Sequence, residues 1–140
     1  MSNLPFTIAV DADGVLWEDA YPGMGLIRPK TIEALIYAQA EGAVLILNTC
    51  RTGDLLAAAL ESAETAWLEF DYANANDPRR IEAFGGDCRK ISADLYVEDK
   101  GVGWPGDDEA VASAIYAAVR AWLEAQKRGL AETDAKKKGD

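Results

Sequence analysis

The chain has 140 residues, which is long enough for one globular domain with a buried core. Of these residues, 49 % are hydrophobic and 27 % charged, as is usual for a globular protein. Its net charge of −10 disfavours nonspecific binding to nucleic acid or anionic membranes. It contains no histidine, which excludes Ser-His-Asp and Cys-His hydrolases and histidine-ligated metals. An enzyme built from this chain has to rely on carboxylates, Lys, Arg, Thr and a hard metal ion.

The chain shows no targeting or membrane-spanning signal. No apolar run reaches the roughly eighteen residues of a transmembrane helix. The N-terminal segment has no basic region before its short apolar run, unlike a signal peptide. We therefore expect a cytoplasmic protein that does not enter a membrane, with its two cysteines, Cys50 and Cys88, as free thiols.

The stretch from Pro5 to Trp17, PFTIAVDADGVLW, begins with an apolar run typical of a buried parallel strand. The run ends at Asp11 and Asp13, and Gly14 follows. Because ligands of open α/β sheets bind beyond the carboxyl ends of the strands, these two acids arrive where chemistry usually occurs. Taken alone, the stretch leaves an Asp-rich turn as an alternative.

Helices and strands are then expected to alternate. Pro29 suits the first turn of a helix that Gly42 stops, and an apolar strand follows at residues 43–47. A second helix is expected to start near residues 52–54. Its apolar face is marked by Leu56, Leu60, Ala63 and Trp67.

The second half of the chain continues this pattern. A weaker strand is expected at residues 70–73, then a loop at 74–88 with at most a short helix at 81–84, then a strand at 93–97. The last helix can be capped by Asp107 and Asp108. The charged segment 129–140 is expected to be a disordered tail, which leaves one domain at residues 1–128.

This alternation predicts a Rossmann-like α/β fold, in which a central parallel sheet lies between two layers of helices. Right-handed crossovers place the carboxyl ends of all the strands at one edge of the sheet. That edge is expected to collect the following oxygen-bearing side chains: Asp11, Asp13, Thr49, Glu98 and Asp99.

These residue types suit phosphoryl chemistry at a magnesium ion. Mg²⁺ binds through one or two carboxylates, water and a substrate phosphate, and Asp11 with Asp99 or Glu98 can supply the carboxylates. A carboxylate beside such an ion can attack phosphorus, and a second acid, Asp13, can transfer protons.

Two further residues can donate to phosphoryl oxygens. Thr49 offers a hydroxyl and Lys90 a cation. Taken singly, each has an ordinary alternative, since Thr49 can cap a helix and most lysines are simply exposed.

In this order the residues resemble the four motifs of the haloacid dehalogenase (HAD) superfamily of phosphohydrolases. The resemblance spans about residues 6–101 and rests on DADGVL at 11–16, Thr49 after an apolar strand, Lys90, and the pair Glu98-Asp99. Residues 48–51 (NTCR) and 87–91 (DCRKI) also resemble small, minimally capped bacterial and phage members. A receiver domain of two-component signalling uses similar residues but in a different order along the chain.

The resemblance implies a role for each matching residue. Asp11 is expected to be the nucleophile and a Mg²⁺ ligand, and Asp13 the general acid/base whose backbone carbonyl also contacts the metal. Asp99, with Glu98 beside it, would complete the metal site. The family often has two aspartates there, so Glu98 is a departure, and we favour Asp99 as the direct ligand.

Four residues are expected to bind the phosphate: Thr49, Cys50, Arg51 and Lys90. Arg51 is also the best candidate in a rim of basic residues that would attract anions; the other members are Arg79, Arg80, Arg89 and Lys90.

The sequence thus predicts a Mg²⁺-dependent phosphohydrolase acting through an aspartyl-phosphate. Small phosphate esters, nucleotides included, are the leading substrate class, and the net charge disfavours a nucleic-acid end. Because the segments 14–28 and 74–89 leave only a minimal cap, a second copy of the chain is one way to close the site. The alternative function is a HAD-fold module that binds Mg²⁺ or phosphate with little or no turnover.

Overall fold

The computed structural model describes residues 4–139, with side chains up to residue 130. Its sheet has four strands: β1 (Thr7–Val10), β2 (Val44–Leu47), β3 (Tyr72–Ala73) and β4 (Leu95–Val97). The strand order is β3-β2-β1-β4 and every neighbouring pair is parallel. The predicted parallel sheet is therefore confirmed, and Val10 at the end of β1 lies between Leu47 of β2 and Val97 of β4.

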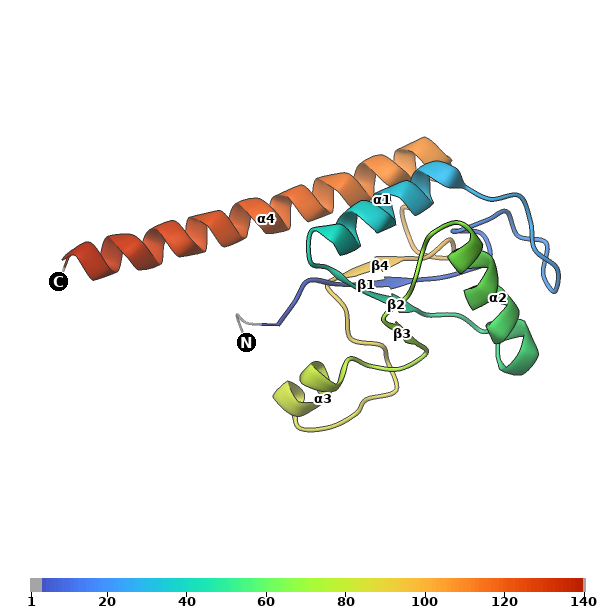
Figure 1. The fold of residues 1–140 in the computed structure, drawn as a ribbon, viewed down its shortest axis with the longest axis horizontal. Coiled ribbons are helices and arrows are strands. Elements are labelled where there is room, and N and C mark those ends of the chain that lie inside the picture. Colours follow the sequence, from blue (N-terminus) through green and yellow to red (C-terminus); the bar gives the residue numbers. More distant parts are fainter. Residues whose placement is uncertain (1–3, 140) are drawn as a thin grey trace.

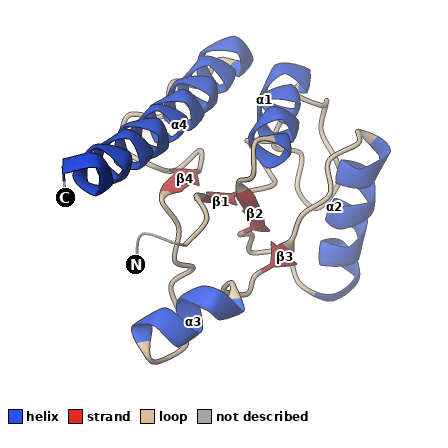
Figure 2. Ribbon diagram, turned by 60° about the vertical axis from the view of Figure 1, so that its left-hand side comes forward, coloured by secondary structure: helices blue, strands red, loops and turns tan. Residues whose placement is uncertain are grey.

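Four helices cover the sheet: α1 (Pro29–Ala40), α2 (Gly53–Thr65), α3 (Pro78–Phe84) and α4 (Asp108–Gly139). Figure 2 shows α1, α2 and α4 on one side of the sheet and α3 on the other. This confirms the three-layer α/β/α arrangement. None of the described helices has both the length and the apolar character needed to cross a membrane.

The larger core lies between the sheet and the helices α1, α2 and α4. One face of β1 and β2 contributes Ile8, Val10, Leu45 and Leu47, all fully buried. Asp108 at the start of α4 accepts hydrogen bonds from Thr31, from the backbone N–H at 2.9 Å and from the hydroxyl at 2.7 Å. Because Asp108 caps the first turn of α1, the two helices are joined by a polar contact as well as by packing.

The opposite face of the sheet is covered by a smaller cluster, which comprises Ala9, Val44, Ile46 and Ile91. A polar contact helps to hold α3 there. The buried guanidinium of Arg80 lies 3.2 Å from the hydroxyl of Thr7 on β1 and 2.6 Å from the carboxylate of Asp94, just before β4. Arg80 therefore fixes α3 to both strands.

Helix α3 is longer than the sequence analysis expected. It begins at Pro78, and the side chain of Asp77 accepts a hydrogen bond of 3.0 Å from the N–H of Arg79. An N-cap aspartate followed by proline is a standard helix start, so this signal was present in the sequence.

Two expectations for the helices differ from the structure. Helix α2 ends at Thr65, and Trp67 has a positive φ of 68° and an exposure of 88 %, so it does not continue the apolar face of the helix. Helix α4 continues to Gly139 through the segment expected to be a disordered tail, and Asp140 lies outside the described residues (Figure 1). The segment contains two alanines and three lysines, which are strong helix formers.

Replacing Arg80 by methionine tests its part in holding α3. Because Arg80→Met removes the hydrogen bonds to Thr7 and Asp94, we expect the free energy of unfolding to fall by about 1–3 kcal/mol. Arg89→Met, at an exposed position nearby, is the control and should change stability by less than about 0.5 kcal/mol. Equal urea midpoints for the two variants would contradict this role.

Candidate functional site

The carboxyl ends of β1, β2 and β4 meet at one edge of the sheet. The backbone N–H of Asp11 donates to the carbonyl of Val97 at 3.0 Å, and that of Asn48 donates to the carbonyl of Val10 at 2.7 Å. The strand pairing therefore continues for one residue beyond β1 and β2. The loops that follow these strands carry most of the residues singled out in the sequence.

Asp11 and Asp99 bring two carboxyl groups together at this edge. Burial raises the pKa of Asp11, the neighbouring Asp99 and Glu98 add to this rise, and a hydrogen bond from the N–H of Ala12 opposes it, so that the pKa is about 7. Gly14 allows the close approach of Asp99, since a Cβ on Gly14 would overlap the Asp99 carboxylate, with its Cγ at 2.7 Å. The φ of Gly14 is +85°, which glycine adopts readily.

This carboxyl pair fits a hard divalent cation. A cation between Asp11 and Asp99 would relieve the repulsion that helps to keep Asp11 protonated. Within residues 4–130, no group of three or more His, Cys, Asp or Glu side chains is arranged to hold a metal. Two carboxylates with water and a substrate phosphate are nevertheless a usual Mg²⁺ site. Glu98 is exposed and influences the pKa of Asp11 less than Asp99 does, which favours Asp99 as the second ligand.

Asp13 lies in a different electrostatic environment from Asp11. Arg51 donates to both of its oxygens, from Nε at 2.7 Å and from a terminal nitrogen at 2.8 Å, and Trp17 Nε1 donates at 3.0 Å. The hydrogen bond from Arg51 holds the pKa of Asp13 below its usual range. In this arrangement Asp13 is an ion that can accept a proton but has none to donate.

Arg51 does not belong to an anion-attracting rim, and the sequence-based expectation has to be corrected. Its side chain is only 1 % exposed, because the guanidinium is enclosed by Asp13 and by the carbonyls of Pro22 and Gly23. Two other residues expected in the rim are also engaged: Arg79 pairs with Asp77, and Arg80 is buried against β1.

Thr49 is well placed to donate a hydrogen bond. Its hydroxyl oxygen accepts from the backbone N–H of Arg51 at 3.1 Å, which leaves the hydroxyl hydrogen for a ligand. The side chain of Asn74 shapes this loop, since it accepts from the N–H of Thr49 at 2.8 Å and donates to the carbonyl of Arg51 at 3.3 Å. The sequence analysis missed Asn74, although it directly follows the expected strand at 70–73. Cys50 is exposed in the same loop.

Lys90 is exposed, and its ammonium lies over the ring of Tyr96 at 5.1 Å. Within the described side chains, it forms no ion pair with the carboxylates of the site. The backbone that carries Lys90 is held by Asn76, which donates to the carbonyls of Cys88 at 3.0 Å and Lys90 at 3.2 Å. The backbone at Lys90 is therefore held by Asn76, whereas the side chain is exposed and lies over Tyr96.

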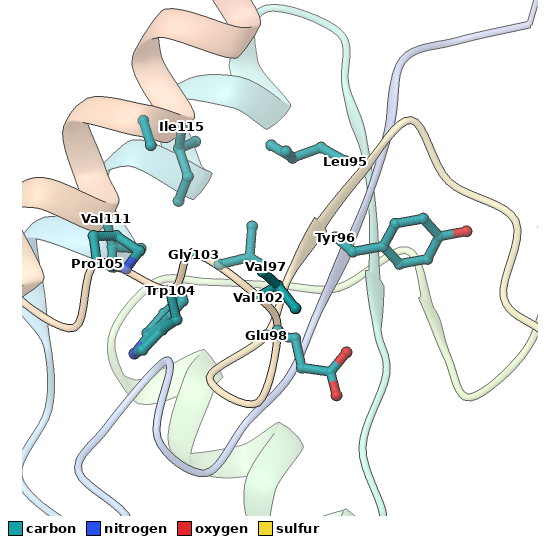
Figure 3. A pocket seen from close by; sticks show the side chains of 12 residues that line it. Leu95, Tyr96, Val97, Glu98, Val102, Gly103, Trp104, Pro105, Val111 and Ile115 are labelled. Carbon is teal, nitrogen blue, oxygen red and sulfur yellow. The ribbon is translucent and has the colours of Figure 1, made fainter.

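An apolar cavity of about 200 Å³ lies between β4, the 101–105 loop and α4. Its walls include Val97, Val102, Trp104, Val111 and Ile115 (Figure 3). Glu98 is at its border, but Figure 3 shows that the Glu98 carboxylate points away from the apolar side chains. The cavity therefore offers no polar group at its centre that would orient a phosphate.

No family model matches the chain, and no curated protein matches it. A solved structure of a conserved protein from Bacteroides thetaiotaomicron is similar to it, with 37 % sequence identity and a TM-score of 0.71. The similarity covers 84 % of this chain and 92 % of the Bacteroides chain. It therefore includes nearly the whole of the related protein.

Gly14→Ala tests the packing of Asp99 against the backbone at Gly14, in the loop that follows β1. The added Cβ would displace the Asp99 carboxylate, and a φ of +85° costs alanine about 1–2 kcal/mol. We expect lower stability and weaker Mg²⁺ binding, measured by urea unfolding and titration calorimetry. The control is Gly86→Ala, where an added Cβ meets nothing within 4 Å. If both variants bind Mg²⁺ as the parent does, Asp99 does not depend on Gly14.

The raised pKa of Asp11 predicts how stability depends on pH in metal-free protein. Between the ordinary value of 3.8 and about 7, the folded chain binds a proton that the unfolded chain does not, so stability falls as the pH rises through this range. Asp11→Asn removes this loss. At pH 8 we expect it to be more stable than the parent by about 2 kcal/mol, which is about half of what a shift of this size gives for a fully buried group, because Asp11 is partly exposed; at pH 4 we expect the two to be about equal.

Urea unfolding at pH 4, 6 and 8 in the presence of a chelator measures this effect. Glu64→Gln, at an exposed carboxylate on α2, is the control and should show no such pH-dependent gain. An advantage of Asp11→Asn that is constant across this range would contradict the assigned pKa.

Proposed function

We propose that this chain, which belongs to the same protein family as the conserved Bacteroides thetaiotaomicron protein, is a Mg²⁺-dependent phosphohydrolase of HAD type. The proposed substrates are small phosphomonoesters, with nucleotides as the leading class. The observation that carries the proposal is the interaction between Asp11 and Asp99 beyond the carboxyl ends of β1 and β4, a pair of carboxyl groups that would suit a hard cation.

The proposed reaction begins at Asp11. The Ala12 N–H holds Asp11 Oδ1 at 2.8 Å, which leaves Oδ2 to attack phosphorus. As the aspartyl-phosphate forms, the bond from phosphorus to the ester oxygen breaks, and the alcohol oxygen takes a proton. The hydroxyl of Thr49 and the ammonium of Lys90 would stabilise the phosphoryl oxygens. A bound Mg²⁺ would supply positive charge opposite the anionic nucleophile and phosphate.

The second half of the reaction assigns a role to Asp13. Water attacks the phosphorus of the aspartyl-phosphate, the bond to Asp11 breaks, and Asp13 accepts the proton that the water loses. Its lowered pKa suits this step, because a carboxylate that is ionised can act as a base. The earlier step, protonation of the alcohol, requires Asp13 to be protonated and turned from Arg51.

The contacts of Asp13 favour a second candidate function. Because Arg51 and Trp17 engage both oxygens of Asp13, the alternative is a module that binds Mg²⁺ and phosphate with little turnover. In either case we propose a cytoplasmic protein, and a second copy of the chain closing the open site is an alternative to an uncovered one.

A panel of phosphate esters assayed with and without Mg²⁺ separates the two functions. For the hydrolase we expect Mg²⁺-dependent release of phosphate. Asp11→Asn should abolish both turnover and the phosphoenzyme, whereas Asp13→Asn should lower kcat by about 10²–10⁴-fold. Glu64→Gln is the control and should retain parental activity.

Two outcomes would overturn the hydrolase proposal. One is parental activity in Asp11→Asn, which would exclude this residue as the nucleophile. The other is no turnover of any ester by the parent while it still binds Mg²⁺ and inorganic phosphate, which would establish the binding module instead.

A further inference from the structure

The loop at residues 18–28 folds back onto residues 16–18, which lie a few residues after the end of β1. The N–H of Glu18 donates to the carbonyl of Leu26 at 2.8 Å, and the N–H of Arg28 donates to the carbonyl of Leu16 at 2.9 Å. Gly25 lies so close to the backbone of Glu18 that a Cβ would clash with it. The 18–28 loop is therefore a closed hairpin rather than an open excursion.

Arg51 reaches this hairpin from the segment between β2 and α2. Its terminal nitrogens donate to the carbonyl of Pro22 at 3.2 Å and to that of Gly23 at 2.7 Å. Its guanidinium carbon lies 5.1 Å from the centre of the Tyr21 ring. One side chain thus contacts three successive residues at the tip of the 18–28 loop.

The same guanidinium holds Asp13 at its opposite side. The two hydrogen bonds, at 2.7 and 2.8 Å, form a bidentate pair, which fixes the orientation of a carboxylate as well as its position. Of the five N–H groups of Arg51, these contacts use two, and the two carbonyls use two more. Little of Arg51 is left for a substrate phosphate.

Burial makes these contacts interdependent. Since Arg51 is 1 % exposed, a guanidinium that loses Asp13 would remain as an uncompensated charge inside the protein, which is strongly unfavourable. Asp13 can therefore leave its present orientation only if Arg51 moves as well. Arg51 can move only by changing its contacts with Pro22 and Gly23.

From this geometry we propose that Arg51 is a positioning residue that couples the placement of the 18–28 loop to the orientation of the Asp13 carboxylate. In the arrangement described here, the loop is closed and Asp13 faces Arg51. A shift of the loop that draws Arg51 away frees Asp13 to turn toward the Asp11 edge of the site. The coupling follows from the contacts alone, while its consequence for turnover rests on the proposed phosphohydrolase function.

Hydrogen exchange of the backbone N–H groups of Glu18, Gly23 and Arg28 tests the coupling without any assay of activity. In Arg51→Met we expect these groups to exchange at least about tenfold faster than in the parent. The decisive variant is Asp13→Asn, which leaves Pro22 and Gly23 unchanged but weakens the hold on Arg51. It should accelerate exchange at the same groups.

Two further variants sharpen this test. Arg51→Lys keeps the charge without the bidentate geometry and should give intermediate exchange, which also covers the case in which Arg51→Met does not fold. Glu64→Gln should leave exchange at the parental rate.

Steady-state kinetics on an ester that the parent hydrolyses tests the consequence for turnover. Because a positioning role acts on the orientation of Asp13 and not on substrate, it predicts that Arg51→Met changes kcat by about tenfold or more while KM changes by less than about twofold. A rise in KM with unchanged kcat would show that Arg51 binds substrate, and would overturn the positioning role.

The exchange result stands even if the parent hydrolyses no ester, so failure of the coupling and failure of the proposed function are distinguishable. Faster exchange in Arg51→Met but parental exchange in Asp13→Asn would overturn the coupling, since the loop would then be independent of Asp13.

Discussion

Parallel pairing of β1 with β2 on one side and with β4 on the other is the constraint on which the candidate site depends. The pairing runs beyond the strands, through the N–H of Asp11 to the carbonyl of Val97 and the N–H of Asn48 to the carbonyl of Val10. Three loops therefore start at the same level of the sheet. The main core supports this arrangement from one face and the contacts of Arg80 from the other.

Asp11 and Asp13 are two residues apart, and yet their pKa values are shifted in opposite directions. Burial and the contact with Asp99 raise the pKa of Asp11, whereas the bidentate hydrogen bond from Arg51 lowers that of Asp13. A pair of carboxyl groups whose pKa values are pushed apart is a feature of sites that divide two chemical roles between similar residues. Here burial and Asp99, whose close approach Gly14 permits, raise the pKa of Asp11, and Arg51 lowers that of Asp13.

The sequence predicted the features that depend on local pattern. The apolar runs at 6–10 and 43–47 gave β1 and β2, and Pro29 and Gly42 bounded α1 closely. Features that depend on distant contacts could not be predicted in this way. Nothing near Arg51 shows that its partner is Asp13, 38 positions away, and nothing near Trp67 shows that α2 ends before it.

Two asparagines near the site also could not be assigned a role from the sequence. Asn74 and Asn76 lie in a polar segment typical of a loop, and the sequence around them does not show which backbone groups they bind. In the folded structure, Asn74 holds the Thr49 loop and Asn76 holds the backbone of Lys90. The sequence singled out Thr49 and Lys90 as candidate phosphate-binding residues, but it did not identify the two asparagines that hold their backbone.

The engagement of Arg51 also changes how a phosphate ester would be attracted to this site. Arg51 and Arg80 are held by internal partners and Arg79 pairs with Asp77, in a chain of net charge −10. The ammonium of Lys100 lies 3.7 Å from Asp99 Oδ2, and that of Lys90 lies over the ring of Tyr96. Two carboxyl groups at the same edge would repel a phosphate dianion. In the proposed function, recognition of the phosphate would therefore depend on a divalent cation at Asp11 and Asp99 more than on basic side chains. The substrate would then bind tightly only when the metal ion is also bound.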